Sequence, residues 1–173
     1  MTAAFSWWLA STVIGLLALP VARRLFRALP DQGVALARPL GSLLLSYLVW
    51  LLGLSHVIPN GRLAVALAMV ALATVGFVMV ARQPKEWREW LRRSWRQVAM
   101  VEGLFATAFV LFALLRSYSP EIAGTEKPMD FALLNGVLRS PSFPPADPWL
   151  AGHPISYYYF GHLQAATLTS LTG

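Results

Sequence analysis

The sequence predicts an all-α fold: a polytopic bundle of transmembrane helices, with four complete spans and the start of a fifth. Hydrophobic residues make up 57% of the 173 residues and charged residues only 13%, whereas soluble domains carry about 25% charged residues. Several apolar runs reach the length of about 20 residues that crosses a hydrocarbon core, and none alternates like a barrel strand. The chain contains no Cys, which excludes disulfide scaffolds, thiolate metal sites and Cys nucleophiles.

The predicted spans cover residues 5–22, 40–57, 63–81 and 98–115, and a fifth begins near Tyr157 and is still apolar at Gly173. The first run could instead be a secretory signal peptide, but residues 1–6 lack the basic residues that such a peptide requires. We therefore expect a retained span. We divide the chain into residues 1–97 and 98–173, and expect it to be the N-terminal part of a longer polypeptide that adds further spans.

Basic residues predict the orientation of these spans. Ten of the 14 lie in the connections between spans one and two and between spans three and four. The positive-inside rule places both connections in the cytoplasm. The N-terminus and residues 116–156 then lie outside a multi-pass protein of the cell membrane. The net charge of +6 is mainly this topology signal, so we expect the lipid bilayer, and no nucleic acid, as a partner.

Charged residues within and beside the spans have less specific interpretations. Residues 85–95 place Trp between Arg and Glu at helical spacing, which predicts a short helix in the headgroup layer with Trp87 and Trp90 facing lipid. Glu102 lies about one turn into span four, where it either marks a functional site or reaches back to the interface. We expect the second. His56 at the end of span two is interpreted as a capping or interfacial residue.

Most chemistry-bearing residues lie between Tyr118 and His162, a segment with four of the eight acidic residues and two of the three His. Thr125 is predicted to cap a helix over residues 127–138, whose apolar stripe would lie on the outer membrane surface. Glu126 and Asp130 are four residues apart and share a face at its N-terminus, where the helix dipole stabilises anions. This suits a base or a metal ligand, and plain helix capping fits equally well. The stripe comprises Met129, Leu133, Gly136 and Val137.

Two further blocks follow this helix. Five prolines between Ser140 and Pro154 exclude a regular helix or central strand, and predict a packed loop over the mouth of the bundle. Three consecutive tyrosines then begin the fifth span, where successive side chains point about 100° apart. At least one hydroxyl should therefore face the bundle, with Tyr158 and His162 on one face. A metal site formed by His153 and His162 is disfavoured, since their spacing matches no recognised ligand pattern.

Three motifs together carry a resemblance to a known family. They are Glu-Lys-Pro-Met-Asp-Phe-Ala from Glu126, Phe-Pro-Pro-Ala-Asp-Pro-Trp-Leu-Ala-Gly over residues 143–152, and Tyr-Tyr-Tyr-Phe-Gly-His over residues 157–162. This combination resembles the YYY domain family, large and largely uncharacterised polytopic membrane proteins named for the triple tyrosine. The resemblance is close over about residues 124–162. That family is in turn similar to the GT-C class of glycosyltransferases, which transfer a sugar from a polyprenyl-phosphate carrier.

The resemblance implies roles for individual residues. Glu126 and Asp130 would form the acidic motif, as catalytic base or as ligands of a divalent metal such as Mg²⁺ or Mn²⁺. The implied substrate-binding residues, which would contact the carrier phosphate or the sugar, are Arg139, Asp147, His153, Tyr157, Tyr158, Tyr159 and His162. The alternative is a non-catalytic membrane scaffold or transporter component whose outer loop docks a partner.

Overall fold

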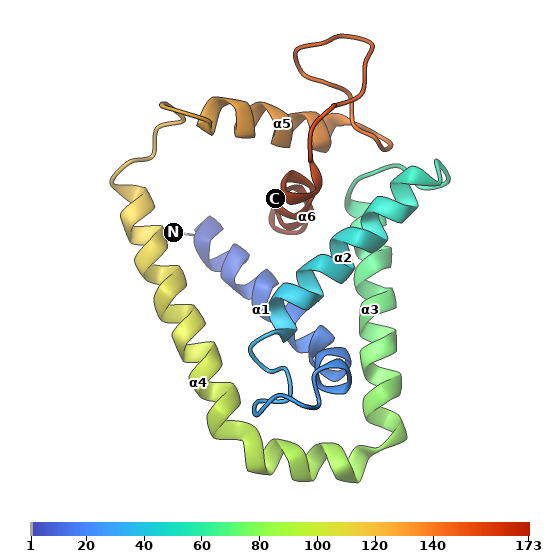
Figure 1. Ribbon diagram of the computed structural model, residues 1–173, viewed down its shortest axis with the longest axis vertical. Helices are drawn as coiled ribbons and strands as arrows, with labels where there is room; N and C mark the ends of the chain where they lie inside the picture. Colours follow the sequence, from blue (N-terminus) through green and yellow to red (C-terminus); the bar gives the residue numbers. More distant parts are fainter. Residues whose placement is uncertain (1) are drawn as a thin grey trace. The chain divides into compact units, whose positions relative to one another are not determined.

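The structure is a computed structural model that describes residues 2–173, and within them it contains six helices and no strand (Figure 1). Four of these helices are long and apolar enough to cross a membrane. The predicted all-α fold with four spans is therefore confirmed, and a shorter helix stands at the position of the expected fifth. The helices are α1 (Thr2–Leu25), α2 (Ala37–Leu54), α3 (Arg62–Arg82), α4 (Pro84–Ser117), α5 (Lys127–Arg139) and α6 (Phe160–Thr172).

Several helix ends differ from the predicted ones by three residues or more. α2 ends at Leu54 rather than at residue 57, and His56 follows with φ of +56°, a left-handed conformation common after a helix end. α4 begins at Pro84 and includes residues 85–95, which were predicted as a separate helix. Figure 1 shows α4 bending between its charged beginning and its apolar remainder. α6 begins at Phe160, after the three tyrosines.

The chain forms two compact units. The first contains the residues up to Ser42 together with Val70–Ser119, and the second contains Leu43–Met69 together with Pro120–Gly173. Both α2 and α3 contribute residues to each unit.

Within the first unit, glycines allow α1 to lie very close to α2 and α3. A Cβ atom added to Gly41 of α2 would stand 2.7 Å from the Ile14 carbonyl oxygen. One added to Gly76 of α3 would stand 2.7 Å from the Leu17 carbonyl oxygen. Small residues at such contacts are typical of packed transmembrane helices, where close backbone approach provides van der Waals attraction.

Arg38 and Glu102 form an ion pair in the same unit. Their closest side-chain atoms are 2.6 Å apart, and the Arg38 guanidinium also lies 3.5 Å from the centre of the Phe105 ring. Sequence reasoning expected Glu102 to reach the interface and placed Arg38 in a connection. The structure places Arg38 in the first turn of α2, which corrects its placement in a connection, and makes it the partner of Glu102. The expected reach of Glu102 to the interface stays a prediction. Pairing of this kind is usual for ionisable residues in membrane helices.

The tryptophans at the start of α4 do not all face outward. Trp90 is only 7% exposed. The Arg23 guanidinium of α1 lies 4.8 Å from the centre of the Trp87 ring and 5.0 Å from that of Trp90. The prediction that Trp90 faces lipid is therefore wrong, because its ring packs against a cation on α1. Trp95, which is 56% exposed, still fits an interfacial position.

Asp31 holds the turn before α2 and allows a test of this part of the fold. Its carboxylate accepts hydrogen bonds from the backbone N–H groups of Ala35 (2.8 Å) and Gly33 (3.1 Å). The bond from Ala35 is the largest influence on the Asp31 pKa, burial opposes it, and the net result lowers the pKa from its ordinary value of 3.8. Because the folded pKa is the lower one, the resulting stability is present above the unfolded pKa and is lost as pH falls through the folded pKa.

Asp31→Asn is therefore expected to destabilise the protein by about 1 kcal/mol at pH 7, because hydrogen bonds to a charged acceptor are stronger than those to a neutral one by about that amount. Thermal unfolding in an uncharged detergent should show the stability difference between Asp31→Asn and the unaltered protein shrinking as the pH is lowered below the folded pKa of Asp31. Glu89→Gln serves as the control, since Glu89 is exposed and forms no ion pair with a described residue. A deficit in Asp31→Asn that stays constant at all pH values would contradict the assignment.

Candidate functional site

The candidate site lies in the second unit, where α5 packs against α6. Leu133 and Val137 of α5 are buried, and so are Leu163 and Ala166 of α6. The predicted apolar stripe of α5 therefore exists, with Leu133 and Val137 as its buried members. Thr125 is not its cap. It adopts φ of +43°, and Glu126 stands at the N-cap position without a side-chain capping bond.

Asp130 and His162 form the central contact of the site. Asp130 lies in the first turn of α5 and His162 in the first turn of α6, so helix packing brings together residues 32 positions apart. The Asp130 Oδ1 and His162 Nε2 atoms are 3.2 Å apart. The Asp130 side chain is 56% exposed, whereas that of His162 is 17% exposed. The other ring nitrogen of His162, Nδ1, is buried without a hydrogen-bond partner among the described residues.

Tyr157 and Tyr158 lie near the same carboxylates. Their rings stack with centroids 4.1 Å apart. The hydrogen bond with Tyr158 is the main cause that raises the pKa of Tyr157, and the negative charges of Glu126 and Asp130 add smaller contributions in the same direction. The structure therefore brings the acidic motif and the triple-tyrosine motif together. We call Glu126, Asp130, Tyr157, Tyr158 and His162 the acidic–tyrosine cluster.

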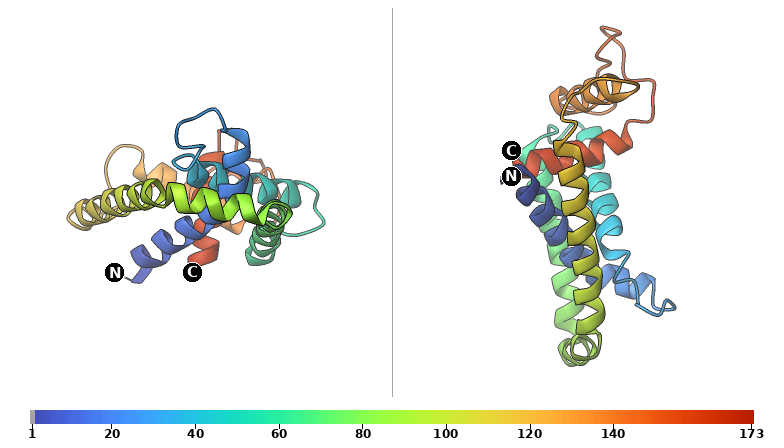
Figure 2. Two further views of the ribbon diagram at one scale, coloured as in Figure 1. Left: turned by 90° about the horizontal axis from the view of Figure 1, so that it is seen from below. Right: turned by 90° about the vertical axis from the view of Figure 1, so that its left-hand side faces the viewer.

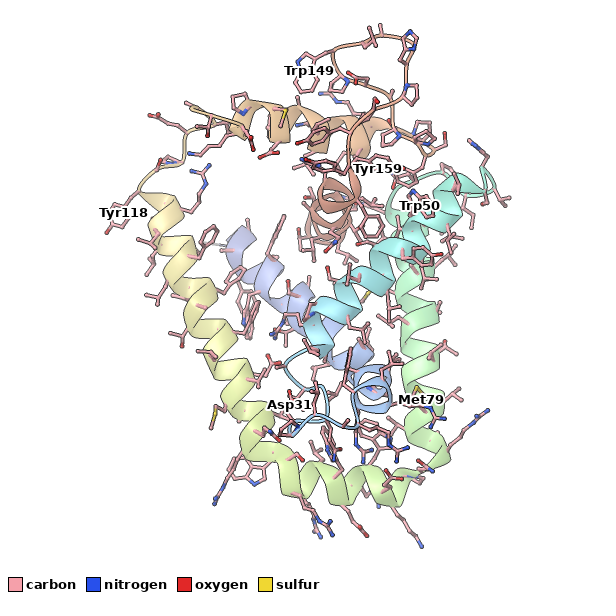
Figure 3. The ribbon with its side chains drawn as sticks, viewed as in Figure 1. Asp31, Trp50, Met79, Tyr118, Trp149 and Tyr159 are labelled. Carbon is pink, nitrogen blue, oxygen red and sulfur yellow. The ribbon has the colours of Figure 1, made fainter. Side chains whose placement is uncertain are left out.

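Tyr159 has a different environment. It is half-buried, its hydroxyl accepts a hydrogen bond of 2.9 Å from Trp50 Nε1, and its ring stacks on that of Phe143 with centroids 6.1 Å apart (Figure 3). This contact with Trp50 of α2 agrees with the prediction that at least one of the three hydroxyls faces the bundle. The assumption that the three tyrosines lie on a helix is wrong, because all three precede α6. Tyr158 and His162 therefore do not share a helix face.

The other predicted site residues lie away from the cluster. Arg139 is nine residues beyond Asp130 on α5, or about 13 Å along the helix axis at 1.5 Å per residue. Together with Asp147 it lines a groove of about 470 Å³ between α5 and the proline-rich loop. Asp147 Oδ1 accepts the backbone N–H groups of Trp149 and Leu150, so this carboxylate also stabilises a turn. His153 is exposed in the same loop.

The proline-rich loop is packed only in part, since Phe143 is buried whereas Trp149 and Leu150 are 62% and 58% exposed. Phe143 is 1% exposed and packs so closely on Gly53 that a Cβ there would stand 2.5 Å from its ring. Asn60 Nδ2 donates to the carbonyl oxygens of Val137 (2.8 Å) and Ser140 (3.1 Å). Figure 1 and Figure 2 show the rest of the loop projecting beyond α5, on the side away from α6.

Sequence reasoning missed Trp50, Gly53 and Asn60 as supports of this region. Asn60 belongs to a Pro-Asn-Gly sequence that indicates a turn, and nothing in it indicates bonds to residues 77 and 80 positions later. Trp50 resembled an ordinary apolar residue of a span. The indole N–H was the available signal, because a buried indole usually finds a hydrogen-bond acceptor.

The donor groups for a metal are incomplete in this unit. Among residues 3–173 no group of three or more His, Asp or Glu side chains is arranged to hold a metal ion. Glu126 and Asp130 would offer carboxylate oxygens, which Mg²⁺ and Mn²⁺ prefer, but the Asp130 carboxylate contacts His162. A metal held by Glu126 and Asp130 stays a prediction, and no step proposed below passes through one.

Four long apolar helices define the class of this chain, which is a multi-pass membrane protein. The family described as "Uncharacterized membrane protein (DUF2298)" matches residues 44–173, and the chain belongs to that family. No curated protein and no solved structure matches the chain. The matched residues include the whole acidic–tyrosine cluster and its supports Trp50, Gly53 and Asn60.

Proposed function

We propose that the protein is a GT-C-like glycosyltransferase that moves a sugar from a polyprenyl-phosphate carrier at the outer face of the membrane. The contact between Asp130 and His162 carries this proposal. It joins two of the three motifs that resemble the triple-tyrosine family, and it places a carboxylate beside a histidine. The basic residues of the two other connections support the outer position of the cluster.

In the proposed reaction, the Asp130 carboxylate takes the proton of the acceptor hydroxyl. The acceptor oxygen attacks the anomeric carbon, the bond from that carbon to the carrier phosphate breaks, and its electron pair leaves with the phosphate. His162 holds one oxygen of Asp130 through Nε2. Because the Asp130 side chain is 56% exposed, its other oxygen can reach an acceptor. A base in this position commonly contributes a rate factor of about 10² to 10⁴.

The remaining predicted residues take subsidiary parts in the proposal. Tyr157 and Tyr158 present a stacked, exposed pair of rings against which a sugar can pack. Arg139 lies too far along α5 to contact a phosphate that also contacts Asp130. We therefore propose that Arg139, with Asp147 and His153, binds a part of the substrate away from the reacting bond. Tyr159 would support the loop through Trp50.

The test is sugar transfer by the intact protein in membranes, with a labelled polyprenyl-phosphate sugar as donor. Glu126→Gln and Asp130→Asn are each expected to slow transfer by about 10²-fold or more, whereas Glu89→Gln on α4 should leave it unchanged. Full activity in both acidic variants would remove the acidic motif from the mechanism. If the unaltered protein transfers no sugar from such donors, the non-catalytic alternative is favoured.

A further inference from the structure

A second group of charged residues lies in the first unit, apart from the acidic–tyrosine cluster. α1 ends with Arg23 and Arg24 in its last turn, Arg27 follows, and α3 ends with Arg82. These four arginines line a cavity of about 430 Å³. Glu86 of α4 supplies the single acidic side chain in its lining. Four positive charges thus face one negative charge, and the cavity attracts anions.

Arg23 is held in place and shapes one wall. Its guanidinium forms an ion pair with Glu86 (2.9 Å), donates to Gln32 Oε1 (3.1 Å) and packs over two tryptophan rings. The Arg23 side chain is only 16% exposed. Glu86 is thereby neutralised by a residue that is already fixed, and the charge available to a ligand comes from the other three arginines.

Arg24, Arg27 and Arg82 form no ion pair with any residue of the described chain. All three are exposed. Positive charge in the last turn of α1 and α3 also stabilises those helix ends. This accounts in part for the presence of Arg24 and Arg82 at these positions. It does not explain why both helix ends and Arg27 line one cavity. Several guanidinium groups lining one cavity suit a phosphate, whose oxygens accept hydrogen bonds from such groups.

The rest of the lining points to a lipid rather than to a soluble anion. The cavity lies where the candidate spans α1 and α3 both end, and its apolar wall is formed by Pro20 and Met79. Figure 3 shows Met79 near the end of α3. Gln83 and Trp87 complete the lining, and tryptophan is enriched at the level of lipid headgroups. A phosphate bound among the arginines would keep the glycerol and acyl chains beside the apolar wall and the surrounding bilayer.

We propose that this cavity binds the phosphate of an anionic phospholipid headgroup. Basic pockets between transmembrane helices bind such headgroups on the cytoplasmic side, which is the side that the basic residues predict for this part of the chain. The proposal does not depend on the glycosyltransferase function. It concerns the other unit and different residues.

The test uses native mass spectrometry of the intact protein in a neutral detergent. Dioctanoyl phosphatidylglycerol, dioctanoyl phosphatidylcholine and inorganic phosphate are the probes. We expect phosphatidylglycerol to bind about tenfold or more tightly than phosphatidylcholine, and inorganic phosphate at equal concentration not to displace it. Combining Arg24→Gln, Arg27→Gln and Arg82→Gln should weaken phosphatidylglycerol binding about tenfold or more.

The matched control combines Arg92→Gln, Arg93→Gln and Arg96→Gln, which removes three charges from exposed positions of α4 outside this cavity. It should retain most of the binding. An equal loss in both variants would overturn the site in favour of general surface charge. Equal binding of the two lipids, or displacement by inorganic phosphate, would overturn the lipid assignment. If the triple variant fails to fold, two measurements test the site instead. They are the phosphatidylglycerol binding of Arg82→Gln alone, which should be weaker, and the two-lipid comparison on the unaltered protein.

Discussion

Asp130→Asn is expected to slow sugar transfer by about 10² to 10⁴-fold, the range for loss of a general base. Asparagine has nearly the same shape and keeps an oxygen that can accept a hydrogen bond from His162, but it cannot take a proton. The fold should tolerate the change, because the Asp130 side chain is 56% exposed and its side-chain contact is with a single histidine. Initial rates with labelled donor should show a large fall in kcat and little change in KM.

His162 provides the matched series for this prediction. His162→Gln retains an N–H donor for Asp130 and should lower kcat less than His162→Leu, which has none. Both variants should keep the unfolding temperature within a few degrees of the unaltered protein. Activity of Asp130→Asn above half the normal rate would contradict the assignment of the base. Equal effects of the two His162 substitutions would contradict the positioning role.

Gly76→Ala is expected to destabilise the protein by about 1–3 kcal/mol, as overpacking of a close contact usually does. The added methyl group would stand 2.7 Å from the Leu17 carbonyl oxygen. That neighbour is backbone, so relief requires α3 to move away from α1. Helix propensity works in the opposite direction, since alanine is favoured over glycine in a helix by about 1 kcal/mol. The sign of the result therefore reports the steric contact.

Gly103→Ala in α4 is the matched control, because nothing lies within 4 Å of its added Cβ. Both glycines are in apolar, span-length helices, so the two substitutions differ mainly in what the methyl group meets. Gly103→Ala should stabilise the protein slightly or leave it unchanged. Unfolding by increasing fractions of a denaturing detergent measures both variants. Changes of the same sign and size at the two positions would contradict the close packing of α1 and α3.

The spans could be predicted because long apolar runs are a local property of the sequence. The side-chain contacts between the spans could not be predicted in this way. Arg38 and Glu102 are 64 positions apart, and Trp50 and Tyr159 are 109 positions apart. Such polar contacts depend on how helices pack, and no spacing rule covers them. α4 was predicted to be shorter for a related reason, since its charged beginning lacks the apolar character by which a span is recognised.

The candidate site was predicted in its residue types but not in its contacts. The position of Asp130 near a helix N-terminus identified it, whereas its partner His162 comes from another helix 32 positions later. The pairing of Tyr158 with His162 failed because it assumed that one helix carried both. A single turn's difference in where α6 begins removes that shared face. The predicted roles of Arg139, Asp147 and His153 stay predictions.

The bonds of Asn60 have a consequence for the order in which the chain can fold. The turn between α2 and α3 leaves the ribosome long before its partner Ser140, which lies 80 positions later. Until then the Asn60 amide lacks its two carbonyl partners, and Gly53 is not covered by Phe143. The second unit therefore cannot close progressively from its N-terminal end. The parts of α2 and α3 that belong to this unit are therefore made before the later segment that packs on them.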